Sequence, residues 1–398
     1  MRKAVGRGRV WRVSTAVMAF HVVAACGPAV ETVERRDSLG VAIVESHAPA
    51  WGVGPSWQLD TSPRLSLGRD DGEPAELFHR LVATVRQPNG DVAVMDGATQ
   101  ELRLFDSAGR HRWTFGRRGG GPGEFRQVLT LLRWPGDSLA VFDFMVGRIT
   151  VVSPDGKLGR ITTVLAGGPG VHGLQIVDDS ILVAKAIMMT ALSGSGHTRI
   201  PAAIVTTPLA RLDPDTIAIV PGEETMLLGG GGSGGILYGK DAALAVAGSA
   251  IVVGTAERLE IMWFDGAGRI AQLSRVPGFN LSIPPAERAA ERQFLLGANP
   301  TPQVVARVDA MPALTMRPAY RSLIGDPTGA VWAEPHRPFS DPEGPRPWQV
   351  FAPTGEWLGP FQMPPRFRAF DIGRDYLLGV QTDSMGVERV RLFQLNRA

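Results

Sequence analysis

Few residues in this chain stand in a pattern that catalytic chemistry is known to need. Residues 231–235 (GGSGG) fit the G-x-S-x-G pattern around a nucleophilic serine, here Ser233. That pattern serves catalysis where a strand turns sharply into a helix, whereas here it lies inside a run of glycines. Residues 119–123 (GGGPG) are also rich in glycine, but Pro122 and the strand-like sequence after it offer no helix N-terminus for a dinucleotide. Neither segment therefore predicts an active site.

The histidines do not form a metal-binding motif. No His-Glu-x-x-His sequence and no Gly-Lys-Ser/Thr phosphate loop occurs. Six histidines beyond the N-terminal segment stand singly: His47, His79, His111, His172, His197 and His336. We interpret each of them as a surface or packed histidine.

The composition predicts a folded chain with many turns. Of the 398 residues, 44% are hydrophobic and 20% are charged, which suits a large core and excludes a disordered chain. The 48 glycines and 31 prolines are typical of a protein built with tight turns. The net charge is +2 and no long basic run follows the N-terminus, so nucleic acid is not an expected partner. A single cysteine excludes an intrachain disulfide.

The N-terminal segment has the composition of a targeting signal. Residues 1–12 hold five basic side chains and no acid, and residues 13–25 are mostly apolar or small. The apolar stretch is too short to span a bilayer and suits a signal peptide. Residues 23–26 (VAAC) resemble the end of a bacterial lipoprotein signal, which implies that Cys26 is lipidated and becomes the mature N-terminus. The alternative is an ordinary signal peptide followed by a chance cysteine.

We therefore expect a protein of the cell envelope, outside the cytoplasm, whose N-terminal lipid anchors it to a membrane. Loss of residues 1–25 leaves 36 basic residues against 39 acidic ones. No second segment approaches about 18 apolar residues, so the mature body is expected to be tethered to the membrane and not to cross it.

A repeat of short strands and turns fills the rest of the chain. Residues 81–125 hold four strand-like segments separated by turn signals such as Pro88-Asn89-Gly90-Asp91. The turns recur 46 or 47 residues later, and weaker copies follow to the C-terminus. That makes six units, of which the last, residues 367–395, lacks one strand. Residues 57–68 can supply it, which would close a ring and leave no open edge.

The four-strand unit resembles the NHL-type propeller repeat. Residues 92–125 carry the motif best, with an apolar strand that ends in Asp96, the sequence LRLFD with its turn, and the sequence GPGEF. The resemblance implies an all-β, six-bladed β-propeller of four-stranded antiparallel blades, closed by an N-terminal strand. We predict a signal peptide at 1–25, a tether and lead-in at 26–56 and the propeller at 57–398. Insertions are expected near 187–200, 222–241 and 277–318, the last one with a small helical insertion at 284–297 and a second, shorter helical turn near 304–310.

The resemblance also implies which face of the propeller carries function. In such propellers the loops after the second strands and between blades open on one face. The residues that end the six second strands are Asp96, Asp143, Lys185, Thr255, Glu334 and Gln381. We expect them to ring the mouth of the central channel, with Arg117 and Arg118 of the first inter-blade loop close by.

This ring suits two kinds of chemistry. Its carboxylates could hold calcium, or Asp96 and Asp143 could instead cap turn amides. Arg117 and Arg118 could bind an anion together with the amides of residues 119–123, or those glycines could only serve a tight crossing. A lactonase-like metal site usually adds an Asn ligand, and no Asn ends a strand here.

We therefore expect that the chain is a binding module without catalytic activity and that its ligand is a small molecule or an envelope protein. Calcium is a possible cofactor. The alternative is a metal-dependent hydrolase or lyase of the lactonase kind with its site at the channel mouth. Propeller families include both classes, so the fold does not choose between them.

Overall fold

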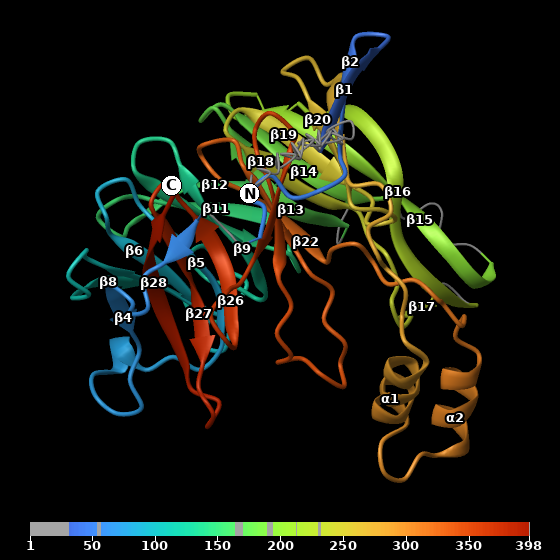
Figure 1. The fold of residues 1–398 in the computed structure, drawn as a ribbon. Helices are drawn as coiled ribbons and strands as arrows, with labels where there is room; N and C mark the ends of the chain where they lie inside the picture. Colours follow the sequence, from blue (N-terminus) through green and yellow to red (C-terminus); the bar gives the residue numbers. More distant parts are fainter. Residues whose placement is uncertain are drawn as a thin grey trace, which may run out of the picture. The chain divides into compact units, whose positions relative to one another are not determined.

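Short antiparallel sheets account for most of the computed structural model, which describes residues 32–53, 57–163, 170–188, 194–211, 213–229 and 232–397. Six sheets follow one another along this part of the chain (Figure 1). The predicted signal peptide and the predicted lipidation site Cys26 lie outside the described residues.

The first of the repeating sheets shows how the sequence builds each one. Its strands pair in chain order: β5 (Leu81–Arg86), β6 (Val92–Asp96), β7 (Glu101–Phe105) and β8 (His111–Phe115). All five residues of β6 are buried because this strand has neighbours on both sides, whereas β8 alternates between exposed and half-buried residues. The turn between β5 and β6 uses Gly90 at a φ of +93°, a conformation that glycine adopts without strain.

The other five sheets repeat this order. The second sheet has β9 (Val128–Trp134), β10 (Ser138–Asp143), β11 (Arg148–Val152) and β12 (Leu158–Thr163). The third has β13 (Val171–Val177), β14 (Ile181–Ile187), β15 (Ser195–Pro208), β16 (Asp215–Gly229) and β17 (Gly232–Gly235). The fourth includes β18 (Ala243–Ala247), β19 (Ala250–Gly254), β20 (Glu260–Phe264) and β21 (Ile270–Arg275). The fifth has β22 (Ser322–Gly325), β23 (Val331–Glu334), β24 (Trp348–Phe351) and β25 (Trp357–Phe361). The sixth includes β26 (Phe367–Ile372), β27 (Tyr376–Thr382) and β28 (Glu388–Asn396).

The sheets pack face to face, with their first strands together. The six first strands (β5, β9, β13, β18, β22 and β26) each contact the first strand of the next sheet, and β26 contacts β5. Six apolar clusters fill the spaces between neighbouring sheets. One of them joins the sixth sheet to the first through residues such as Val380 and Val94. This is the arrangement of a β-propeller, in which each sheet buries both faces against its neighbours.

The N-terminal segment runs along the outer edges of three sheets. A hairpin of β1 (Val33–Ser38) and β2 (Val41–Ser46) pairs in parallel with β21 and extends the fourth sheet. Backbone hydrogen bonds then tie Ala50 and Trp51 to the outer strand of the fifth sheet. The short strands β3 (Gln58–Leu59) and β4 (Leu65–Leu67) pair with β28 of the sixth sheet.

A helical insertion separates the fourth sheet from the fifth. Figure 1 shows α1 (Pro285–Leu296) beside α2 (Pro302–Asp309), and Arg292 of α1 pairs with Asp309 of α2 at 2.5 Å. Pro285 starts α1 and Gly297 ends it, as the sequence predicts. A single turn of 3₁₀ helix, η1 (Pro74–Glu76), lies between β4 and β5. In the described part of the chain, no helix is both long enough and apolar enough to cross a membrane.

The coarser prediction of a mostly β protein with many four-stranded antiparallel sheets is confirmed. The structure differs from the sequence interpretation at three places. Residues 33–46, interpreted as part of a tether, form the β1–β2 hairpin and join a sheet. Gly232–Gly235, in the glycine run of the insertion expected near 222–241, pair with β16 as β17. The insertion near 304–310 is a full helix, α2, so the chain has two inserted helices instead of one helix and a turn.

Candidate functional site

The six predicted mouth residues occupy equivalent positions at the ends of the second strands. Asp96 pairs in register with Leu81, and Asp143 pairs with Val128, so each lies beside the start of a first strand. The same holds for Lys185, Glu334 and Gln381, while Thr255 directly follows the end of β19. Among the described residues, none of the six binds another through its side chain.

The carboxylates of Asp96 and Asp143 bind backbone amides. Both residues are fully buried. Asp96 accepts hydrogen bonds from the backbone N–H groups of His79 at 2.9 Å and Ala98 at 2.8 Å. Asp143 accepts them from Arg126 at 2.7 Å and from Gln127 at 3.1 Å. Each carboxylate thus fixes the point where the chain enters one strand and leaves another, as the capping interpretation describes.

Lys185 is the centre of a group of ionisable side chains at the same end of the third sheet. The nearly buried Lys185 ammonium donates to the Asp241 carboxylate at 2.5 Å and to the Ala242 carbonyl at 2.8 Å. His172 pairs in register with Lys185, and burial, followed by the charge of Lys185, lowers the pKa of its imidazole. Burial and the nearby Asp241 carboxylate raise the pKa of Glu223. Groups with displaced pKa values that lie close together are candidates for a functional site.

The remaining mouth residues make local contacts. The Ser322 hydroxyl donates to the Glu334 carboxylate at 2.6 Å, and the Gln381 amide donates to the Pro365 carbonyl at 3.1 Å. The Thr255 carbonyl accepts a hydrogen bond from Arg199 at 2.5 Å. Glu334 thus forms its contact through its side chain, whereas Thr255 forms its contact through its backbone.

The anion position predicted beside Arg117 and Arg118 is filled by a side chain of the same loop. The Glu124 carboxylate accepts hydrogen bonds from the Gly121 N–H at 2.9 Å and from Arg117 at 2.9 Å. These two contacts, in that order, lower the pKa of Glu124. A Cβ on Gly119 would lie only 2.1 Å from the same carboxylate, so the glycine makes room for it. Arg118 donates instead to the Ala98 carbonyl at 2.8 Å.

A cavity that the sequence interpretation did not foresee lies among the first strands. Its volume is about 460 Å³, within the range of small-molecule sites, and residues of all six first strands line it. None of the eight predicted site residues is part of its wall. On β5 and β9 the wall begins at Val82 and Leu129, next to the register partners of Asp96 and Asp143. On β26 and in the turn after β22 it extends to Ile372 and Pro327, towards the other end of the first strands.

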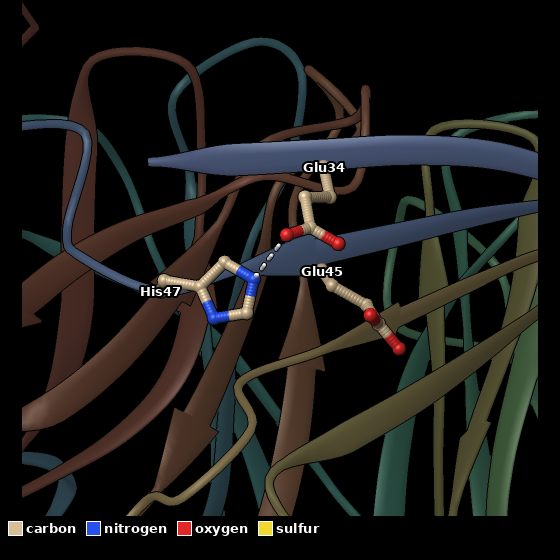
Figure 2. A group of neighbouring side chains, drawn as sticks. All are labelled: Glu34, Glu45 and His47. Carbon is tan, nitrogen blue, oxygen red and sulfur yellow. Dashed lines mark ion pairs between the residues drawn. The ribbon is translucent and has the colours of Figure 1, made fainter. Parts of the chain in front are cut away.

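A group of three potential metal ligands lies on the N-terminal hairpin (Figure 2). Atoms of Glu34, Glu45 and His47 are all within 4.8 Å of one another, and His47 Nε2 is 3.3 Å from the Glu34 carboxylate. It is the one such group of three within the described residues. However, Glu45 also pairs with Arg36 at 3.1 Å and with Arg275 at 3.2 Å. The two guanidinium groups already balance the carboxylate charge and oppose a cation there.

Comparison with known proteins supports the fold alone. No family model matches the chain, and no curated protein matches it. A solved structure of a member of the duf4221 family from Bacteroides vulgatus ATCC 8482 is similar at a TM-score of 0.50 and 12% identity, covering 86% of this chain and 99% of that chain. A candidate exported protein from Bacteroides fragilis NCTC 9343 gives a TM-score of 0.48 at 11% identity, with 89% and 99% covered. A gluconolactonase from Xanthomonas campestris gives 0.44 at 10% identity, with 85% and 100% covered.

Proposed function

We propose that this chain is a lipid-anchored protein of the cell envelope that binds a small ligand in the channel of a closed, six-bladed, NHL-like propeller and performs no chemistry on it. The observation that carries the proposal is the cavity of about 460 Å³ among the first strands. Largely pre-formed cavities of this size with mostly apolar walls are the usual form of small-molecule sites.

Closure of the ring is supported from both ends of the chain. The last sheet packs on the first through a shared apolar cluster, and β26 contacts β5. The pairing of β3 and β4 with β28 gives the sixth sheet the outer strand that the C-terminal sequence lacks. A closed ring leaves only short, protected strand edges around the channel, which suits a pre-formed binding site.

Binding is favoured over metal-dependent catalysis by the state of the buried acids. The oxygens of Asp96 and Asp143 that would ligate calcium accept backbone N–H groups instead. We propose that Lys185 and Glu334, with Thr255, Gln381, Arg117 and Arg118, form the mouth of the channel and guide a ligand or an envelope protein to it. Calcium binding stays open, with no calcium ligand set assigned at the channel.

Membrane attachment rests on Cys26. Its place after three small or apolar residues is what a lipid-modified N-terminus requires. Replacing it, as Cys26→Ser, is expected to move the protein from the membrane fraction to the soluble fraction. Mass spectrometry that finds an unmodified Cys26 in the mature protein would refute the anchor without affecting the channel.

A blocked channel tests the binding function. Leu129→Trp places a large side chain in the cavity, and Leu158→Trp is its matched control. Both leucines belong to the second sheet and are similarly exposed, at 40% and 42%, but Leu158 lies on the outer strand β12. Small molecules that raise the unfolding temperature of the wild type and of Leu158→Trp should lose this effect on Leu129→Trp.

Two outcomes would contradict the proposal. Equal responses of the two tryptophan variants would show that ligands bind elsewhere. Stoichiometric calcium in the purified protein, together with calcium-dependent hydrolysis of a lactone, would favour the catalytic alternative.

A further inference from the structure

The wall of the cavity offers apolar side chains on every side. Each first strand contributes one that is half-buried or exposed: Val82, Leu129, Ile176, Val246, Ile324 and Phe370. Leu129 is 40% exposed although it lies on an inner strand. An apolar molecule in the cavity would remove this surface from water, which is favourable. The wall therefore suits the aliphatic part of a ligand.

One cation stands at the end of this apolar wall. Arg133, four residues after Leu129 and about 13 Å farther along β9, also lines the cavity. Its guanidinium donates to the Arg86 carbonyl at 2.6 Å and to the Tyr376 hydroxyl at 2.9 Å, and it pairs with the Asp371 carboxylate. Its Nη1 atom has no partner within the described residues, and the side chain is 41% exposed. The guanidinium is thus fixed from one side and open on the other.

The Asp371 carboxylate beside Arg133 is shared with other donors. Asp371 also accepts hydrogen bonds from the Arg86 N–H at 2.9 Å and from the Tyr376 hydroxyl at 3.0 Å. The Arg86 guanidinium stacks over the Tyr376 ring at 4.7 Å and forms no ion pair in the described part of the chain. Asp371 is thus engaged by Arg133, by the Arg86 N–H and by Tyr376, and it holds the Arg133 guanidinium from one side only. On the far wall, Asp326 is neutralised by Arg397 at 2.8 Å, and the exposed Asp179 is solvated.

We infer that the cavity binds an amphipathic anion, with an aliphatic chain along the apolar wall and a carboxylate or phosphate head at Arg133. The inference rests on the proposed binding in the channel and adds the class of ligand and its orientation. A charge-assisted hydrogen bond to a fixed guanidinium is strong and directional, so the head group sets the orientation while the chain supplies the apolar contact.

Calorimetric titration of the purified full chain with four probes of equal chain length tests this inference. Decanoate and decyl phosphate carry the anionic head, decanol carries none, and decyltrimethylammonium carries the opposite charge. The variant is Arg133→Gln and its matched control is Arg112→Gln. Both arginines are partly exposed and pair with a mostly buried aspartate, but Arg112 lies on the outer strand β8 with Asp91 at 2.6 Å.

We expect decanoate, decyl phosphate or both to bind, and Arg133→Gln to weaken that binding at least tenfold. Arg112→Gln should change the affinity less than twofold, and added salt should weaken the anions but not decanol. If Arg133→Gln does not fold, Arg133→Lys replaces it in the test. We then expect Arg133→Lys to weaken binding of the anionic probes, by a smaller factor than the tenfold expected for Arg133→Gln. The better of the two anions identifies the head group.

The inference is overturned if decyltrimethylammonium or decanol binds as tightly as the anions, or if Arg133→Gln leaves anion binding unchanged. In that event the Leu129→Trp variant separates the two proposals. Probe binding that Leu129→Trp abolishes would leave the channel site intact with a different ligand class. If none of the four probes binds, the ligand is not an amphipathic anion and the inference is refuted. The proposed binding function is still tested separately, by the effect of other small molecules on the unfolding temperature of Leu129→Trp.

Discussion

At the scale of single residues, two buried carboxylates and one half-buried carboxylate, that of Glu124, serve the backbone where one sheet passes to the next. Asp96, Asp143 and Glu124 each accept hydrogen bonds from backbone N–H groups of a crossing or turn. A buried amide without a partner destabilises the fold, so an acid at such a place has a structural role even without a ligand. The type and position of these residues suggested chemistry, but their partners show capping.

Asp143→Ala should therefore lower the free energy of unfolding by about 2–4 kcal/mol, because it leaves several N–H groups without an acceptor. The matched control is Asp155→Ala in the same sheet, an exposed residue that pairs with Lys157, for which we expect a change of at most about 0.5 kcal/mol. Urea unfolding measures both. Unchanged stability of Asp143→Ala, combined with a loss of calcium binding, would restore Asp143 to the role of a metal ligand.

At the scale of elements, the helical insertion is held to the body by polar contacts. The fully buried Glu291 of α1 accepts hydrogen bonds from the backbone of Phe339 at 3.0 Å and Ser340 at 2.5 Å. Arg317 pairs with Glu287 of α1 at 3.1 Å. His336 lies beside this contact with its ring 5.3 Å from that of Tyr238, and its buried Nε2 has no hydrogen-bond partner. The imidazole is therefore accommodated as a neutral group.

Acid should weaken this part of the structure through His336. Burial, and next the charge of Arg317, lowers the pKa of His336 to about 4 from an ordinary value of 6.5. Between these two values the unfolded chain binds a proton that the folded chain does not, so stability is lost as the pH falls from 6.5 towards 4. From pH 7 to pH 5 the loss attributable to His336 is about 1–2 kcal/mol.

His336→Phe removes the titrating group and should flatten the pH dependence by that amount. His111→Phe, at an exposed position of β8, should keep the pH dependence of the wild type. Urea unfolding at both pH values measures the difference. A His336→Phe variant that still loses as much stability as the wild type would show that other groups cause the acid sensitivity.

The elements follow from the sequence where local signals and packing agree. Strands β5 to β8 and helix α1 were predictable because apolar alternation, turn residues and a Pro285 start to Gly297 stop all indicate the same boundaries. The β1–β2 hairpin was missed because four of the six residues of β1 are charged, and because the pairing of β2 with β21 is a long-range contact with no local pattern. The cavity was missed because residues such as Leu129 appear in the sequence as ordinary strand residues, and only the packing of all six first strands turns their side chains into a wall.

At the scale of the whole described molecule, Arg397 connects the fifth sheet, the sixth sheet and the N-terminal segment, which meet where the ring closes. Arg397 donates to the Asp326 carboxylate at 2.8 Å in the fifth sheet and to the Gly373 carbonyl at 2.7 Å in the sixth. Its guanidinium also lies 4.3 Å from the ring of Trp57 in the N-terminal segment. The side chain of Asp326 is fully buried, so loss of Arg397 would leave this carboxylate buried without its ion-pair partner.

Arg397→Ala should therefore destabilise the fold by about 3–5 kcal/mol. The substitution leaves the buried Asp326 carboxylate without its partner and removes the contact between Arg397 and the Trp57 ring. Arg374→Ala is the control, because Arg374 is exposed and forms no ion pair among the described residues. Urea unfolding gives the two stabilities, and size-exclusion chromatography reports whether the junction has opened, since a freed edge of the sixth sheet promotes association. Unchanged stability and an unchanged monomeric state of Arg397→Ala would show that closure of the ring depends on the strand pairing of β3 and β4 alone. Deletion of residues 27–68 should then cause the association that the point substitution does not cause.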